Sequence, residues 1–277
     1  MAKKYLFDEN FYAEFYKDVN IKDKESAIKH YRDFGFNESR ISCEEELNDI
    51  LNKNLSTIKK QNELLNKTNF KKPENKLNIL IRTSMRPEFF NECIKSVLNQ
   101  NYSNYHVYVC YDKKECLNYL YDYSLNNKSI TIFYINNDSN KKYKFNLYNN
   151  ILKGFVSDGF IIYLDDDDVF TNNNCFKVIN ENIRNDNNIL IWKFMKPDKL
   201  IYPKDINNIK IGEIDTTSIC FHSKFKNVAK WIDEQCGDYH FYTELFSKLK
   251  EMNQFNIIKV NYILTKTIYH NKFCGSI

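Results

Sequence analysis

Glycine is scarce in this sequence, with 6 residues among 277, or about 2%, against an average usage near 7%. The six stand at positions 35, 154, 159, 212, 237 and 275. No G-x-G-x-x-G pattern can be written from them, and Gly154 and Gly159, which have Walker A spacing, are followed by Phe160 and Ile161 instead of Lys and Ser or Thr. Glycine loops that cradle phosphates are therefore excluded, and a nucleotide's phosphates would need another partner.

Three other features are missing. The 40 basic residues are nearly balanced by 36 acidic ones, which argues against nucleic acid as a partner. The 8 cysteines form no C-x-x-C pair, so zinc and thioredoxin-like sites lack support and reduced thiols are expected. The start of the chain does not resemble a signal peptide, and no apolar run approaches 18 residues. We expect a soluble cytoplasmic protein without a transmembrane segment.

The apolar pattern divides the chain into three parts. Residues 1–42 read as a small helical module, a docking or packing element. Residues 43–76 hold a helix and a linker, and within them the helix at 43–66 either packs on its own protein or joins two copies in a homo-oligomer. Residues 77–277 form the main domain.

The main domain alternates apolar runs with helical patterns. Strands are predicted at 77–81, 107–111, 131–135 and 160–164, and helices at 87–99, around 117–121 and at 145–156. This alternation predicts an α/β fold with a mostly parallel mixed sheet flanked by helices. In such sheets ligands bind beyond the carboxyl ends of the strands.

One predicted strand runs straight into four carboxylates, Asp165 to Asp168. Adjacent carboxylates raise one another's pKa unless a cation or hydrogen-bond donors compensate. In extended geometry Asp165 and Asp167 project to the same side. Mg²⁺ or Mn²⁺ is a suitable partner, because these cations bind one or two carboxylates together with phosphate oxygens, as in a nucleotide diphosphate. The alternative is an acidic loop that caps the next helix.

At this point the sequence resembles the family 2 glycosyltransferases of GT-A fold. The likeness rests on four segments in the family's order: Ile81–Pro87, Ser96–Tyr102, Tyr111–Asp112 and Tyr163–Asp168. One position departs from the family, which usually has Pro-Thr where this chain has Arg82-Thr83. That departure suggests a subgroup with altered donor contacts.

The resemblance implies a metal-dependent, inverting transfer of a sugar from a nucleotide-diphosphate sugar, UDP-linked, to a hydroxyl acceptor such as a glycan, with Mn²⁺ or Mg²⁺ as cofactor. By position, the implied nucleotide-sugar contacts are Thr83, Arg86, Asp112, Asn149, Asp165 and Asp166. Asp112 would bond the base and Asp165 would approach the ribose. Asp167 and the late His270 would bind the metal. Turn chemistry at Thr83 and Asp112, a surface cation at Arg86 and polar helix surface at Asn149 are the plainer alternatives.

Inverting transfer needs a base that takes the proton of the acceptor hydroxyl. The family places an Asp or Glu at the start of a later helix, and Asp238 in Cys236–Phe241 fits that pattern. An ordinary helix N-cap is the alternative, and Asp233 and Glu234 are the nearest substitutes. Four residues are candidates for the acceptor side: Asp215, Thr217, His222 and His240. A structural role at a strand end is the alternative for His222.

Two rival functions remain open. A non-catalytic relative would keep the fold as a binding or scaffold module. A sugar-phosphate nucleotidyltransferase would share the sheet and an acidic metal site, but such enzymes open with a glycine-rich loop, and this chain has no glycine between Gly35 and Gly154.

Overall fold

The computed structural model describes residues 5–16, 19–38, 40–136, 141–210, 213–252 and 255–268. The chain divides into two compact units, residues 1–60 and 61–277. The division falls inside the long helix α3 (Glu44–Lys67). The boundaries predicted at residues 42 and 76 stay a prediction.

The N-terminal unit is helical, as expected from its apolar pattern. It contains α1 (Glu9–Phe15), α2 (Lys24–His30) and a π-helical turn at Tyr31–Gly35. Asp8 caps α1 by accepting the backbone N–H groups of Asn10 and Phe11. Tyr12 is fully buried, and a Cβ at Gly35 would overlap its hydroxyl oxygen. Glycine is therefore required at position 35 by close packing.

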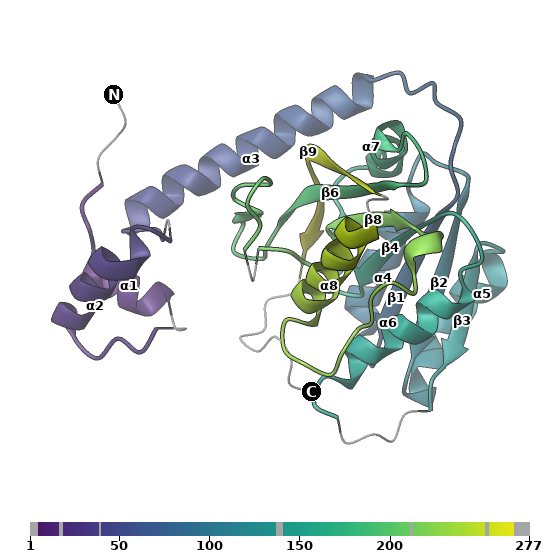
Figure 1. The fold of residues 1–277 in the computed structure, drawn as a ribbon, viewed down its shortest axis with the longest axis horizontal. Helices are drawn as coiled ribbons and strands as arrows, with labels where there is room; N and C mark the ends of the chain where they lie inside the picture. The colour runs from purple at the N-terminus through teal and green to yellow at the C-terminus, as the bar shows by residue number, and fades with distance from the viewer. Residues whose placement is uncertain are drawn as a thin grey trace. The chain divides into compact units, whose positions relative to one another are not determined.

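The larger unit contains a nine-stranded mixed sheet (Figure 1). Its strands are β1 (Leu77–Thr83), β2 (Tyr105–Tyr111), β3 (Ile130–Tyr134), β4 (Phe160–Asp165), β5 (Asp168–Phe170), β6 (Asn188–Met195), β7 (Ile201–Tyr202), β8 (Ile219–His222) and β9 (Asn256–Thr267). They lie in the order β3-β2-β1-β4-β8-β6-β9-β5, with β7 beside β6. The first four are mutually parallel, whereas β8 runs antiparallel to both β4 and β6.

Helices cover both faces of this sheet. They are α4 (Pro87–Leu98), α5 (Leu117–Asn126), α6 (Lys144–Phe155), α7 (Cys175–Asn182) and α8 (Gly237–Met252). One hydrophobic core lies under α4, α5 and α7, and a second lies under α6 and α8. In Figure 1, α6 and α8 lie on the viewer's side of the sheet. The predicted α/β architecture is confirmed.

The period of two along the central strands decides which face each side chain meets. On β1, Ile79 and Ile81 join the core under α4, whereas Leu80 joins the core under α6 and α8. On β4, Leu164 joins the first core and Tyr163 the second. Arg82 follows Ile81 on β1, and Asp165 follows Leu164 on β4, so the alternation turns both side chains to the face covered by α6 and α8. The two residues are also register partners.

The last turns of α3 pack on the sheet of the larger unit. Gln61 and Leu65 are buried there, and the Gln61 side-chain amide both donates to the Ile263 carbonyl at 2.9 Å and accepts its N–H at 2.8 Å. The pairing of β6 with β9 is irregular just before Ile263, so Gln61 satisfies backbone groups beside the bulge. Of the two alternatives for this helix, packing on its own protein applies at its C-terminal end, and self-association stays a prediction.

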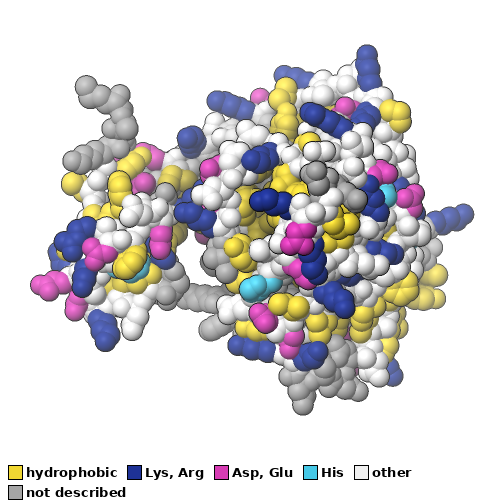
Figure 2. All heavy atoms as spheres, in the orientation of Figure 1, with side chains coloured by type: hydrophobic (Ala, Val, Ile, Leu, Met, Phe, Trp, Pro, Cys, Tyr) yellow, Lys and Arg dark blue, Asp and Glu magenta, His cyan; other side chains and the backbone are white. Residues whose placement is uncertain are grey.

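Three expectations from composition can be compared with the structure. On the face seen in Figure 2, Lys and Arg side chains are interspersed with Asp and Glu. Among the described residues, the buried cysteines are free thiols, and Cys236 is exposed. In the same part of the chain, no helix combines the length and the apolar character needed to cross a bilayer.

Candidate active site

The carboxyl ends of three neighbouring parallel strands meet at one edge of the sheet. Thr83 ends β1, Tyr111 ends β2 beside it, and Asp165 ends β4 next to Arg82. Asp112 and the acidic run follow directly. The sequence therefore brings together, by strand order alone, side chains from three separate segments.

The acidic run does not stay extended. β4 ends at Asp165, Asp166 and Asp167 form a turn, and β5 begins at Asp168. The expected alternation therefore fails beyond Asp165. Asp166 is fully buried and accepts a hydrogen bond from Thr83 at 2.7 Å, and Arg86 pairs with both Asp166 and Asp167. Because the chain turns, Asp167 lies with Asp166 beside Arg86.

Burial is the main influence on Asp166. It raises the pKa of this carboxyl to about 7, while Arg86 and the Thr83 hydroxyl act in the opposite direction. The pKa of Asp167 is also raised, first by burial, with Arg86 lowering it and Asp165 raising it further. Arg86 is thus a positive charge paired with the acidic run, and it is one of the residues that the family resemblance assigned to the nucleotide.

A second group of carboxylates forms beside the first. Carboxylate oxygens of Asp165, Asp168 and Asp215 lie within 4.8 Å of one another. Asp168 also accepts a hydrogen bond from Thr267 at 2.6 Å. Burial, followed by the nearby Asp238 and Asp165, raises the pKa of Asp215 to about 7. An all-oxygen set of this kind suits a hard divalent cation. Asp215, which was expected on the acceptor side, lies in this group.

Arg82, like Asp168 in the second carboxylate group, is a site residue that the sequence analysis did not assign. Its guanidinium holds Asp165 with two parallel hydrogen bonds, Nε to Oδ1 at 2.8 Å and a terminal nitrogen to Oδ2 at 2.9 Å. The other terminal nitrogen donates to Asn146 at 3.1 Å, and the group lies over the Phe145 ring, 4.7 Å from its centroid. The available signal was a charged residue in a buried strand where the family usually has proline.

Asp238 lies in the first turn of α8, which begins at Gly237. Its carboxylate accepts the Tyr239 N–H at 2.8 Å, one of the free N–H groups of the first turn, but Asp238 is the second residue of the helix and not its N-cap. Burial raises the pKa of Asp238, and nearby Asp165 raises it further, whereas Arg82 lowers it. Charges at the ends of β4 and β1 therefore act on Asp238, although more than 70 residues separate it from Asp165 in sequence.

Asp112 and Asn149 have unsatisfied polar atoms. Asp112 accepts a hydrogen bond from the Tyr148 hydroxyl at 3.1 Å through Oδ2, but its buried Oδ1 has no partner among the described residues. The buried Nδ2 of Asn149 is likewise without a described partner. Asn146, one turn earlier on α6, accepts a hydrogen bond from Arg82, which in turn holds Asp165 of the acidic run.

Several predicted acceptor residues point elsewhere. Thr217 is buried and bonds to Thr265 at 3.2 Å. His222 pairs with Phe160, at the end of β4 opposite the acidic run, and lies 3.6 Å from Asp158. It therefore does not join the site, because β8 runs antiparallel to β4. The imidazole of His240 lies 3.8 Å from Glu234. His270 lies outside the described residues.

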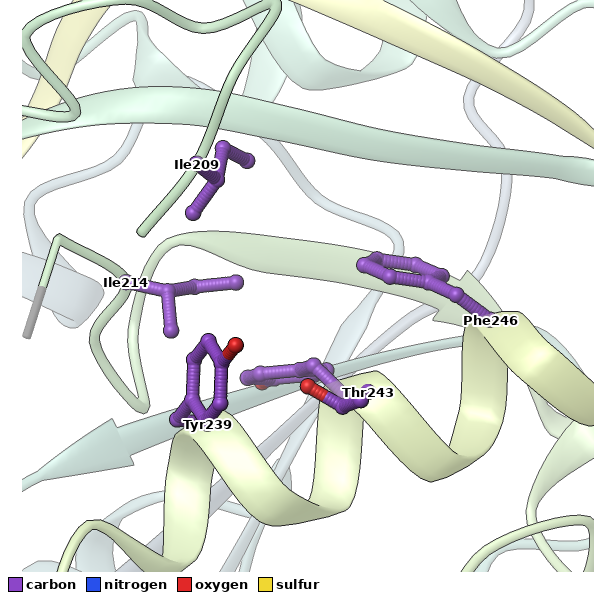
Figure 3. Close-up of a pocket in the computed structure, with 6 residues that line it drawn as sticks. Ile209, Ile214, Tyr239, Thr243 and Phe246 are labelled. Atoms are coloured by element: carbon purple, nitrogen blue, oxygen red, sulfur yellow. The ribbon is translucent and has the colours of Figure 1, made fainter. Parts of the chain in front are cut away.

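A hollow of about 170 Å³ lies against α8. Its lining residues are Ile209, Ile214, Tyr239, Tyr242, Thr243 and Phe246. Figure 3 shows side chains of α8 facing Ile209 and Ile214 across it. Ile214 precedes Asp215 and Tyr239 follows Asp238, so the hollow adjoins both carboxylates in sequence.

Known structures share this architecture. S. aureus TarS 1-349 in complex with UDP-GlcNAc matches with a TM-score of 0.57 and 16% identity, over 72% of this chain and 60% of that one. The mannosyltransferase PcManGT from Pyrobaculum calidifontis, in complex with GDP-Man and Mn2+, matches with a TM-score of 0.55 and 10% identity, over 82% of this chain and 70% of that one. A second structure of S. aureus TarS, for which no residue range is stated, is matched over 37% of its chain. Among curated proteins, none matches this sequence.

The sequence also matches a family model. Residues 79–241, more than half of the chain, match the model of Glycosyl transferase family 2. The matched segment runs from β1 to the first turns of α8 and so contains the acidic run, Asp215 and Asp238. The GT-A type of fold expected from the resemblance is confirmed, and the chain belongs to glycosyl transferase family 2.

Proposed function

We propose that this protein transfers a sugar from a nucleotide-diphosphate sugar, UDP-linked, to a hydroxyl group of a glycan acceptor, with inversion at the anomeric carbon. One observation carries the proposal. The acidic run that ends β4 is joined by Asp215 and Asp238, which come from two later segments, at the edge of the sheet where β1 and β2 also end. The structures of similar fold with UDP-GlcNAc or GDP-Man support a nucleotide-sugar donor.

Donor binding is assigned to the strand ends. Asp112 follows β2 and keeps a buried carboxylate oxygen without a described partner, which suits an N–H group of a nucleotide base. Asp165, held by Arg82, is assigned to the ribose. Thr83 and Arg86 fix the position of Asp166 beside it. Asn149 stays in the proposal because its buried amide nitrogen lacks a described partner.

A divalent cation, Mn²⁺ or Mg²⁺, fits the carboxylates that the structure gathers. The residues that would hold it are Asp165, Asp168 and Asp215, from geometry, and Asp167, from the family resemblance. His270 stays in the proposal from the resemblance alone. A bound cation would supply positive charge that stabilises the diphosphate as it leaves. Arg86 adds a permanent positive charge to the same region.

Asp238 is the proposed general base. Its carboxylate would accept the proton of the acceptor hydroxyl as that oxygen bonds to the anomeric carbon and the bond to the diphosphate breaks. The raised pKa of Asp238 makes its carboxylate a stronger proton acceptor than an exposed Asp. The adjoining hollow, with Tyr239 and Phe246 on its wall, is assigned to the acceptor, and His240 borders it in sequence.

Donor binding and turnover test this proposal. The purified protein would be mixed with Mn²⁺ and, separately, UDP-GlcNAc, UDP-glucose, UDP-galactose and GDP-mannose, and release of the nucleoside diphosphate would be followed. We expect slow release from a UDP-sugar that requires the cation. Full turnover in the presence of EDTA would contradict the metal assignment.

The alternative of a non-catalytic module is separated by binding. A binding module that has lost the donor site would show the same thermal midpoint with Mn²⁺ plus UDP as with Mn²⁺ alone, whereas the proposed enzyme is stabilised by bound nucleotide. Asp112→Asn is the matched variant, because it removes the proposed base contact at a residue outside the acidic run. We expect it to weaken UDP binding about 10-fold, which corresponds to about 1.4 kcal/mol.

A further inference from the structure

We propose that Arg82 and Asn146 form a positioning bridge that couples Asp165, on the donor side, to the loop 232–237 that leads to Asp238. This inference rests on the proposed function, because it assigns a role within that site. The family resemblance assigned no role to either residue, and the bridge is built from hydrogen bonds that these two side chains make to Asp165 and to backbone carbonyls of the loop.

The first half of the bridge is Arg82. Its side chain is 12% exposed and all three guanidinium nitrogens have acceptors, two on Asp165 and one on Asn146. A planar guanidinium bonded on two edges fixes the relative position of both acceptors. Stacking over Phe145, the neighbour of Asn146 on α6, limits its rotation. Arg82 therefore links the end of β4 to the first turn of α6.

The second half is Asn146. Its oxygen accepts from Arg82, and its amide nitrogen donates to the Glu234 carbonyl at 3.0 Å and, more weakly, to the Ile232 carbonyl at 3.4 Å. The side chain is 5% exposed, so both of its polar ends are committed to these contacts. The loop it holds leads in a few residues to Asp238.

The loop is shaped to receive this side chain. Gly237 is buried, and a Cβ there would overlap the Asn146 amide. One of the six glycines in the chain therefore stands where the bridge approaches the backbone most closely. A second contact supports the same arrangement, since the Tyr143 N–H donates to Asp233 at 2.6 Å.

The bridge would affect catalysis through the position of Asp238. Displacement of Asp165 by a bound donor would be transmitted through a rigid guanidinium and a buried amide to the segment that presents Asp238. Misplacement of a reacting group by about 1 Å can cost about 100-fold in rate. Loss of the bridge should therefore lower kcat more than it weakens donor binding.

The test combines Arg82→Lys, Asn146→Ala and the double variant. Lys keeps the charge but lacks the planar fork that holds both oxygens of Asp165 and the Asn146 oxygen in one fixed geometry. We expect each single change to lower kcat about 10- to 100-fold, with the donor KM of Asn146→Ala within about 3-fold of wild type. If both act through one bridge, the double variant should be no slower than the slower single variant. A double variant that loses the product of the two single effects would overturn the proposal.

Asn150→Ala is the matched control. Asn150 lies one turn later on α6 and bonds Trp231 through both its oxygen and its nitrogen, at 3.0 and 2.8 Å, but it does not touch Arg82. We expect its kcat to stay within about 3-fold of wild type. A loss as large as that of Asn146→Ala would mean that general anchoring of the loop explains the effect, and would overturn the bridge.

A readout independent of turnover separates this inference from the proposed function. Amide hydrogen exchange in residues 231–238 should be faster in Arg82→Lys than in wild type, although Arg82 itself does not touch that loop. Unchanged exchange there would overturn the bridge. If no nucleotide sugar is turned over by the wild type, the proposed function fails, and the exchange comparison still decides the bridge.

Discussion

The Thr83 hydroxyl donates a hydrogen bond of 2.7 Å to the fully buried carboxylate of Asp166. This contact joins the last residue of β1 to the turn after β4. Arg86 completes the set from the residue just before α4. The two strand ends that line the proposed donor site are thus held together by one neutral donor and one cation.

Thr83→Val removes the neutral donor and keeps the shape of the side chain. Because it leaves a buried acceptor with one partner fewer, we expect a loss of about 1–3 kcal/mol in the free energy of unfolding. Urea unfolding measures it. Thr57→Val is the control, since Thr57 is exposed on α3 and its hydroxyl donates to the Lys53 carbonyl one turn earlier, and it should change stability by less than about 0.5 kcal/mol. Equal effects of the two changes would contradict the assignment.

Stability should depend on pH through Asp215. Its pKa is raised from 3.8 to about 7 in the folded protein, so between these values the folded state holds a proton that the unfolded state releases. Stability must then fall as pH rises through this window, by up to about 1.4 kcal/mol per pH unit for this group, and level off above it. Asp166 acts in the same direction.

Asp215→Asn isolates the contribution of that carboxyl. In EDTA, the variant should be more stable than wild type at pH 7.5, because it avoids a half-buried charge beside other carboxylates, and the difference should shrink at pH 5, where Asp215 is protonated. Urea midpoints at the two pH values give the comparison. A difference of the same size at both values would show that titration of Asp215 does not contribute.

Gly237→Ala should destabilise the protein through Asn146. The added methyl group would overlap the Asn146 amide, and such overpacking typically costs about 1–3 kcal/mol. In an Asn146→Ala background the space is free, so the same change should cost much less. Chemical unfolding of the four-member cycle measures the difference.

Gly154→Ala is the matched control for that change. Gly154 lies in α6, and a Cβ added there would meet nothing beyond its own stretch of helix within 4 Å, so alanine should be neutral or stabilising by about 0.5–1 kcal/mol. If Gly237→Ala were as harmless as Gly154→Ala, the close approach to Asn146 would not constrain the loop.

The first four strands of the larger unit could be predicted closely from sequence, whereas β5 to β9 were not predicted. The predicted strand at 160–164 is β4 (Phe160–Asp165), and the predicted helix at 145–156 is α6 (Lys144–Phe155). Parallel strands that are buried on both faces have continuous apolar runs in their sequence, and the flanking helices carry an apolar stripe. Both patterns can be recognised within a short stretch of sequence. The start of α8 near Asp238 could be predicted because that helix also carries an apolar stripe.

The pairing of charged side chains could not be predicted in this way. The turn at Asp166–Asp167 contains no glycine or proline, so the sequence suggested an extended run. The pair Arg82 and Asp165 depends on the register of β1 against β4, which no local pattern reveals. Asn146 and Asn149 both lie buried on α6, and only the packing of the helix decides which one meets Arg82.

The central claim is that Asp238 acts as the base of a nucleotide-sugar transfer, and the comparison of Asp238→Asn with Glu234→Gln tests it most directly. Glu234 is exposed just upstream in the same loop. With Mn²⁺, the affinity of Asp238→Asn for UDP should lie within about 3-fold of wild type. With the UDP-sugar that the wild type uses, this variant should form UDP by sugar transfer at least about 100-fold more slowly, because removing a general base costs about 10²–10⁴ in rate. Glu234→Gln should retain nearly full activity. Full turnover by Asp238→Asn would contradict the account.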